Sequence, residues 1–227
     1  MSADKYPPRA VVTCMDFRVK EEVILKNMGW DKETAEYPAG AYFIRNAGGV
    51  VTQDAIRSLM LLQKFVLKKN NPAGVYDIKI LVVAHTHCGM SEDNGNPGDD
   101  AMNKEIEKDW YFCEKAPFSL ESFPSPQLGV RRSIQRLVTS RWVSRRDEQQ
   151  GRPLDILGQV YNVDNNTVSA VDYIIVKQGE TWPALARRAN GERNRGDITP
   201  DVLRDANKWA DRGQLGTNEV FYIPPKP

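Results

Sequence analysis

The strongest constraint on the fold is an almost unbroken apolar run at residues 78–84 (IKILVVA). Such a run is typical of a β-strand that is buried on both faces, as strands of parallel sheets are. Shorter β-branched runs at residues 10–13 and 41–45 predict two further strands, and residues 52–69 have the apolar spacing of a helix that Thr52 caps. The alternation of strand and helix predicts an α/β fold, with a mostly parallel central sheet flanked by helices.

Composition excludes several classes of protein. The chain has 227 residues, of which 41% are hydrophobic, and no apolar run approaches the ~18 residues of a membrane span. The 31 basic and 30 acidic residues give a net charge of +1, which predicts no nucleic-acid partner. Because the first residues have neither the pattern of a secretory signal nor that of a transit peptide, we expect a cytoplasmic protein.

The middle of the chain combines a polar stretch with a basic helix. Residues 91–126 predict a loop with a short helix at 102–112, and residues 128–146 have helical apolar spacing. Phosphate or nucleic-acid binding is one interpretation of the basic helix, but a solvated or interface-pairing face is commoner. Residues 155–162 and 167–171 predict a β-hairpin. The arginines of the basic helix are Arg131, Arg132, Arg136, Arg141, Arg145 and Arg146.

After Val171 a second pattern begins. Residues 172–178 predict a strand, Thr181 a helix that runs to residue 189, Thr199 a second helix that runs to about residue 209, and residues 219–223 a final strand. This order is β-α-α-β. We therefore predict two domains, residues 1–171 and 172–227. The apolar set expected to form a separate small core is Ile174, Val176, Leu185, Ala186, Leu203, Val220 and Ile223.

Cysteine and histidine are concentrated where predicted strands end. Cys14 follows the first strand, and His85, His87 and Cys88 follow the long buried strand; the chain has only two histidines and three cysteines. The carboxyl ends of parallel strands line one crevice, so these side chains are expected to meet there. Two thiolates and one imidazole suit Zn²⁺ and leave one position open for water, as in catalytic zinc sites.

Either histidine is a possible ligand, and spacing separates them. His85 and Cys88 can reach one ion from a single turn, whereas His87 is next to Cys88 and would point to the opposite face of a strand. We therefore predict Cys14, His85 and Cys88 as ligands. The alternative interpretation makes them ordinary buried core residues. It is weakened because both histidines and two of the three cysteines fall just after predicted strands.

Asp16 and Arg18 follow Cys14 in alternation, which places all three side chains on one side if the chain stays extended. Arg18 can then keep the carboxylate of Asp16 ionised through charge-assisted hydrogen bonds. An ionised Asp16 beside a metal can orient a nucleophile. The alternative is an exposed ion pair of little consequence.

These residues carry a resemblance to a known family. Segments 14–18 (CMDFR), 45–49 (RNAGG) and 85–90 (HTHCGM) resemble the three characteristic segments of the β-class carbonic anhydrases, in the family's order. The resemblance extends to about Val171 and is greatest to the short members of the class.

The resemblance implies zinc held by Cys14, His85 and Cys88, and a zinc-bound hydroxide that converts carbon dioxide to bicarbonate. It also implies a homodimer or higher homo-oligomer with the sites near the interface. In some members the aspartate occupies the fourth zinc position and closes the site, so both states stay open for Asp16. Relatives of the short type hydrolyse CS2 or COS. A CS2/COS hydrolase and a zinc-binding scaffold without catalysis are therefore the alternatives to a carbonic anhydrase.

The remaining residues of interest lie outside the ligand set and the Asp-Arg pair. His87 stands where many relatives have an acidic residue, and it is a candidate proton shuttle because its ordinary pKa of ~6.5 suits transfer near neutrality. Asn46, Gly48 and Gly49 predict a close turn around the site, or simply a structural loop. Cys113 matches no motif and is interpreted as a core or surface thiol.

The C-terminal pattern resembles a LysM domain. The similarity lies in residues 173–182 (YIIVKQGETW), Asn207 and residues 220–224 (VFYIP). Glu180 replaces the usual aspartate, and residues 190–197 lengthen the first interhelical loop. LysM domains commonly bind glycans that contain N-acetylglucosamine, and LysM-like domains also dock onto protein assemblies. Both partners stay open for this chain.

Overall fold

The structure is a computed structural model. It describes residues 9–34, 39–63, 78–96, 98, 101, 104, 121–140, 155–207 and 215–226. Cys113, most of the short helix predicted at 102–112, and the basic helix beyond residue 140 lie outside these ranges. Among the described residues, no helix is both long and apolar enough to cross a membrane.

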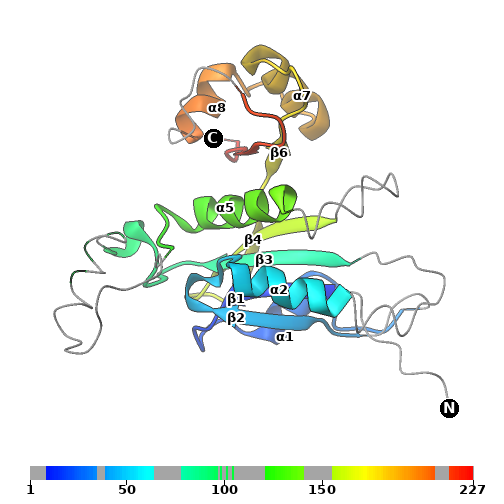
Figure 1. Ribbon diagram of the computed structural model, residues 1–227, viewed down its shortest axis with the longest axis vertical. Helices are drawn as coiled ribbons and strands as arrows, with labels where there is room; N and C mark the ends of the chain where they lie inside the picture. Colours follow the sequence, from blue (N-terminus) through cyan, green and yellow to red (C-terminus); the bar gives the residue numbers. More distant parts are fainter. Residues whose placement is uncertain are drawn as a thin grey trace.

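A five-stranded sheet forms the larger unit (Figure 1). Its strands are β1 (Arg9–Cys14), β2 (Tyr42–Asn46), β3 (Lys79–His85), β4 (Ile156–Asn162) and β5 (Thr167–Ala170). They lie in the order β2-β1-β3-β4-β5. All neighbouring pairs are parallel except β4 and β5, which form the predicted antiparallel hairpin. The predicted mostly parallel sheet is confirmed.

Helices cover both faces of this sheet, which explains why β3 is apolar from Ile80 to Ala84. Helix α1 (Glu21–Asn27) packs on one face, and α2 (Gln53–Leu61) and α5 (Pro126–Thr139) pack on the other. The predicted cap of α2 is present, because the Thr52 hydroxyl accepts a hydrogen bond from the backbone N–H of Ala55. Helix α5 begins two residues earlier than expected, at Pro126, because Ser125 caps it.

The second unit has the predicted β-α-α-β order. It consists of β6 (Tyr173–Ile175), α7 (Trp182–Arg193), α8 (Pro200–Ala206) and β7 (Val220–Tyr222). The prediction for the first helix was too short, because residues 190–193 continue α7 instead of lengthening the loop. The helix ends where Asn194 adopts a left-handed conformation, φ 49°. Thr181 precedes α7 without a side-chain cap hydrogen bond.

The small core of this unit holds all but one of the residues expected there. Val220 is the exception: it is fully buried in the large core, which α5 also lines. The expectation of a wholly separate core is therefore wrong at β7, which faces α5. The residues that form the small core are Ile174, Val176, Trp182, Leu185, Ala186, Ala189, Ile198, Leu203, Phe221 and Ile223.

In Figure 1, α5 lies between the sheet and the C-terminal unit. One of its basic side chains, Arg131, contacts the C-terminal unit. Arg131, which is 8% exposed, donates to the carbonyl of Val220, and burial lowers the pKa of Arg131 to about 10. Arg132 and Arg136 both form ion pairs with Glu121, at 3.3 and 2.5 Å. Of the described arginines, Arg131 therefore contacts the C-terminal unit, whereas Arg132 and Arg136 form ion pairs within the large unit.

Candidate metal centre and active site

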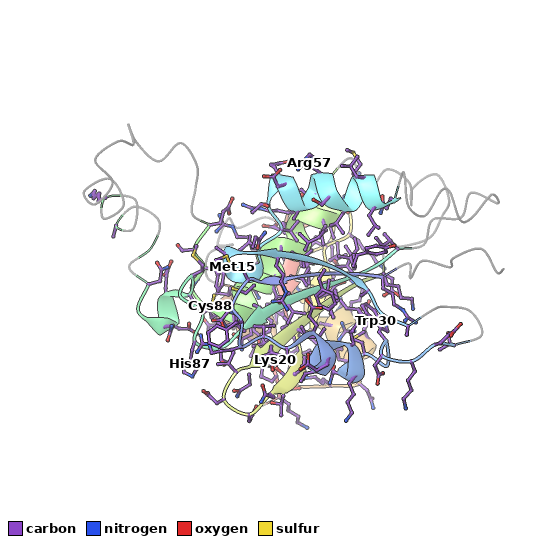
Figure 2. All side chains as sticks on the ribbon, turned by 90° about the horizontal axis from the view of Figure 1, so that it is seen from below. Met15, Lys20, Trp30, Arg57, His87 and Cys88 are labelled. Atoms are coloured by element: carbon purple, nitrogen blue, oxygen red, sulfur yellow. The ribbon has the colours of Figure 1, made fainter. Side chains whose placement is uncertain are left out.

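The fold brings Cys14, His85 and Cys88 together. Cys14 is the last residue of β1 and His85 the last residue of the neighbouring strand β3, and both strands end at the same edge of the sheet. The ligand atoms of the three residues all lie within 4.8 Å of one another. Their exposed fractions are 5%, 1% and 2%, so water barely reaches them. Figure 2 shows Cys88 at this end of the sheet, with Met15 and His87 nearby.

The imidazole of His85 is oriented for metal binding. Its Nδ1 atom lies 2.8 Å from the carbonyl oxygen of Thr86, to which it donates a hydrogen bond. In the neutral imidazole Nε2 then carries no proton, and this atom is buried with no hydrogen-bond partner among the described residues. A buried unpaired nitrogen is costly, and metal-bound histidines commonly have this outer hydrogen bond. The two thiols and this nitrogen are a donor set that fits a zinc ion.

The two thiols differ in their affinity for protons. Hydrogen bonding by the Cys88 thiol lowers the pKa of Cys14 to about 4, although burial opposes this shift. The same interaction, together with burial, raises the pKa of Cys88. Without metal, this hydrogen bond therefore favours one shared proton and one negative charge on the pair. A dication would replace that proton.

Asp16 and Arg18 form the expected pair, but through a turn instead of an extended segment. The backbone N–H of Val19 donates to the Asp16 carbonyl at 3.1 Å, which bends the chain after Cys14. Within the bend, Arg18 donates from Nη2 to Asp16 Oδ2 at 2.7 Å and from Nε to Oδ1 at 3.0 Å. These bonds lower the pKa of Asp16 to about 2. Because Asp16 Oδ2 lies 3.9 Å from His85 Nε2, an ionised carboxylate stands beside the metal-ligand cluster.

His87 points away from this cluster. Its backbone is left-handed, φ 53°, and its carbonyl accepts a hydrogen bond from Arg18 Nη2 at 3.1 Å. The imidazole is 56% exposed, and its Nε2 atom lies 3.0 Å from Asp164 Oδ2. Asp164 comes from the turn between β4 and β5. No motif marked it, because the two residues are 77 positions apart.

The predicted turn packs directly against Cys14. Asn46 is the register partner of Cys14 in the parallel pair of β1 and β2, and its Nδ2 atom donates to the Val50 carbonyl at 2.7 Å. Gly48 and Gly49 have φ of 75° and 66°. A Cβ at position 49 would lie 2.7 Å from the backbone nitrogen of Cys14, closer than real Cβ contacts come. Glycine is therefore required there by both conformation and space.

An apolar wall that sequence reasoning missed completes the site. Val50, Phe123 and the partly exposed Met90 pack on Cys14 and Cys88. Phe123 belongs to the polar stretch that we expected to be loop, and its backbone N–H donates to the Met90 carbonyl at 3.1 Å. Phe123 is one of several aromatic residues in that stretch, and no local pattern distinguished it from the others.

Two large apolar side chains beside the site face solvent. Met15 is 68% exposed and Phe17 is 83% exposed, and they flank Asp16 in the chain. Exposed apolar side chains this close together are typical of surfaces that another molecule covers.

Comparisons with known proteins found carbonic anhydrases and carbon disulfide hydrolases. No protein-family model matches the chain. A carbon disulfide hydrolase of Acidithiobacillus thiooxidans is 40% identical over 86 residues, which are 38% of this chain and 34% of that protein. The chain thus spans about a third of that relative's length. A β-carbonic anhydrase 1 of Mycobacterium bovis is 29% identical over 147 residues, which are 65% of this chain and 76% of that protein.

A solved structure extends the likeness to three dimensions. The carbonic anhydrase of Streptococcus mutans matches 73% of this chain and 82% of its own, with a TM-score of 0.52 and 25% sequence identity. The fold is that of a β-carbonic anhydrase. The relatives and this structure also support the β-carbonic anhydrase family for the chain. In the β-carbonic anhydrase fold described above, a buried Cys-His-Cys cluster lies beside an Asp-Arg pair.

Proposed function

We propose that the protein is a zinc-dependent carbonic anhydrase, a lyase that interconverts carbon dioxide and bicarbonate. One observation carries this proposal: His85 Nε2 is buried, has no hydrogen-bond partner among the described residues, and lies with two thiols beside a carboxylate that Arg18 keeps ionised. The sequence likeness to a β-carbonic anhydrase 1 supports the same reaction.

Each residue of the cluster has a proposed role. Cys14, His85 and Cys88 would hold zinc, which, when bound, supplies a Lewis acid that lowers the pKa of water toward neutrality. The Oδ2 atom of Asp16 accepts a hydrogen bond from the reacting water and so aims a lone pair at the substrate carbon. Arg18 holds that carboxylate in place and keeps it charged, and its engagement of Asp16 supports the open over the closed state of the site. Asn46, Gly48 and Gly49 fix the turn that packs on Cys14.

Turnover also requires that a proton leave the site. We assign this step to His87, because its imidazole is exposed and Asp164 holds it 3.0 Å away by a hydrogen bond. An exposed imidazole held in this way is placed to exchange protons with buffer.

Hydrolysis of CS2 or COS is the second candidate function. The 40% identity to a carbon disulfide hydrolase favours it, although the match covers 34% of that protein. The same metal ligands and the same carboxylate would serve each of these linear electrophiles.

We further propose a homodimer that covers Met15 and Phe17, because both are exposed apolar side chains beside Asp16. Burying them between two copies would remove apolar surface from water and shield the site from solvent. We place the protein in a reducing compartment such as the cytoplasm, since the described site thiols are free.

We propose that residues 172–227 are a LysM-like domain that binds a glycan or docks onto a protein assembly. Its support is the β-α-α-β order and the small core of its own. Beads of chitin or peptidoglycan should retain the full chain, and soluble oligosaccharide should release it. Lack of retention would contradict glycan binding and leave docking.

The reaction is tested by zinc analysis and stopped-flow hydration of CO2. We expect about one zinc per chain. Asp16→Asn should keep the metal but lower turnover by roughly 10²–10⁴-fold, the usual contribution of a positioned proton-transfer group. Asp54→Asn is the matched control, because Asp54 is exposed on α2. Zinc without turnover of CO2, COS or CS2 would support the scaffold alternative, and normal rates in Asp16→Asn would refute the role of the carboxylate.

A further inference from the structure

Helix α5 contacts the C-terminal unit on one side and the walls of the metal-ligand cluster on the other. No part of the proposed reaction uses this arrangement. The helix has 14 residues, and one stretch of it, from Gly129 to Arg136, makes both sets of contacts.

On its outer side, α5 pairs with the free edge of β7. The amide of Gln135 donates from Nε2 to the carbonyl of Asn218 at 2.9 Å and accepts from the backbone N–H of Val220 at 2.6 Å. Arg131 Nε donates to the Val220 carbonyl at 2.5 Å. Arg131 and Gln135 therefore make hydrogen bonds to the backbone of this segment, as a neighbouring strand would. Because Val220 is fully buried, the contact is apolar as well as polar.

On its inner side, α5 holds the turn that packs on Cys14. The fully buried hydroxyl of Ser133 accepts a hydrogen bond from the backbone N–H of Val51 at 3.1 Å. Arg136 donates to the carbonyl of the same residue at 3.2 Å. Val51 follows Val50, which belongs to the apolar wall of the site. Both backbone groups of one turn residue are thus fixed by α5.

The same helix also positions the aromatic part of the wall. A Cβ at Gly129 would lie 2.9 Å from the ring of Phe123, so the ring rests directly on the helix backbone. Arg132 donates to the carbonyl of Ser122 at 3.0 Å. A small shift of α5 would therefore move Val50 and Phe123 together, and both pack on Cys14 and Cys88.

We infer that the C-terminal unit clamps α5 and thereby sets the position of the apolar wall around Cys14 and Cys88. Arg131 and Gln135 are positioning residues in this scheme, because they touch neither the metal ligands nor any substrate. The inference deepens the proposed function and rests on it only for its effect on turnover. The structural part, from Val220 through α5 to Val51, stands independently.

The test loosens the clamp in the full chain, far from the site. Gln135→Ala removes both hydrogen bonds from this side chain to the β7 segment, and the double variant Arg131→Met with Gln135→Ala removes all three. Gln127→Ala is the matched control, because it is the same substitution in the first turn of α5, where the residue makes no hydrogen bond to the described C-terminal unit. Amide hydrogen exchange reports on three backbone groups, those of Val220, Val51 and Phe123, and zinc content and turnover are measured in parallel.

We expect exchange to accelerate at Val220 and, by about tenfold or more, at Val51 and Phe123. Turnover should fall severalfold with zinc content unchanged, and Gln127→Ala should behave as wild type. Faster exchange at Val220 alone, with unchanged exchange at Val51 and Phe123, would overturn the inference. So would continued protection of Val220 in both variants. If the double variant does not fold, the single variant decides. A wild-type protein without turnover would refute the proposed function, while the exchange results would still decide the clamp.

Discussion

Buried polar groups near the metal-ligand cluster and in the core of the C-terminal unit differ in their hydrogen bonding. At the carboxyl end of the sheet, His85 Nε2 and Asn46 Oδ1 are buried without hydrogen-bond partners among the described residues. In the C-terminal unit, the buried Asn207 amide donates to the carbonyls of Leu203 and Tyr222, and its oxygen accepts from the Tyr222 N–H. Most buried polar groups in proteins are paired, so unpaired ones need an explanation. Two of the unpaired atoms, His85 Nε2 and Asn46 Oδ1, thus lie at the end of the sheet that holds the metal-ligand cluster.

Glu180 is a second polar residue of the C-terminal unit whose side chain is hydrogen-bonded. Its carboxylate accepts two hydrogen bonds from Arg188, both at 2.8 Å, and one from the Lys177 backbone N–H at 3.0 Å. Arg188 in turn donates to the Ile175 carbonyl. The glutamate that departs from the LysM pattern therefore ties α7 to the end of β6. Substitutions in this unit should change stability, and substitutions at the sheet edge should change chemistry.

The largest expected effect is at Cys88. Cys88→Ala removes one of the three converging ligand atoms, so the protein should lose zinc and all measurable turnover. Zinc analysis and CO2 hydration measure the effect. Cys113→Ala is the matched control, because Cys113 matches no motif, and it should retain both. Full zinc content in Cys88→Ala would show that the buried cluster is ordinary core.

A glycine pair tests how tightly the turn is built against Cys14. Gly49→Ala should lower the free energy of unfolding by about 3 kcal/mol or more, because the left-handed conformation and the backbone contact both oppose a Cβ. Gly29 has a similar φ of 63° but no atom within 4 Å of an added Cβ. Gly29→Ala should therefore cost about 1 kcal/mol. Urea unfolding measures the difference, and equal losses would mean that the close approach contributes nothing.

The ion pair in the C-terminal unit should stabilise in a pH-dependent way. Hydrogen bonds from Arg188 lower the pKa of Glu180, so its contribution is present above its ordinary pKa and lost as the pH falls through the lowered value. Glu180→Gln should cost about 1–2 kcal/mol at neutral pH. The difference in the free energy of unfolding between wild type and Glu180→Gln should become smaller in acid. Glu192→Gln is the control, since Glu192 pairs with the same arginine but is 43% exposed, and it should cost less than about 0.5 kcal/mol. If the difference in the free energy of unfolding between wild type and Glu180→Gln did not change with pH, that result would argue against an ionised pair.

The smallest effect is expected at His87. His87→Ala should lower turnover severalfold in weak buffer, because proton exit slows, and added imidazole should restore the rate. Asp164→Asn should show a weaker version of the same loss. Stopped-flow hydration of CO2 at several buffer concentrations measures both. A rate that does not respond to imidazole would leave His87 with a packing role.

Much of the site followed from the sequence because it lies at strand ends. The apolar run before His85 identified a buried parallel strand, and the topology of such sheets then placed Cys14 near His85 and Cys88. The spacing of His85 and Cys88 selected between the two histidines. Local pattern was sufficient wherever a functional residue directly follows a strand.

The remainder depends on contacts between distant segments. Asp164 reaches His87 from a hairpin turn, and Phe123 joins the wall from a stretch with no apolar periodicity. The pairing of Gln135 with β7 spans more than 80 residues. Val220 has the same apolar character whether it faces the small core or α5, so its sequence cannot distinguish the two. Such contacts are properties of the assembled fold.

The connection between the units has one more consequence. Strand β5 ends at Ala170 and β6 begins at Tyr173, so only Val171 and Asp172 join the two sheets. Two residues span about 7 Å at most. The C-terminal unit therefore cannot move far from the large sheet. Any surface that bound this unit would hold the large sheet close to it, and the hydrogen bonds of Arg131 and Gln135 to the β7 segment would limit rotation of one unit against the other.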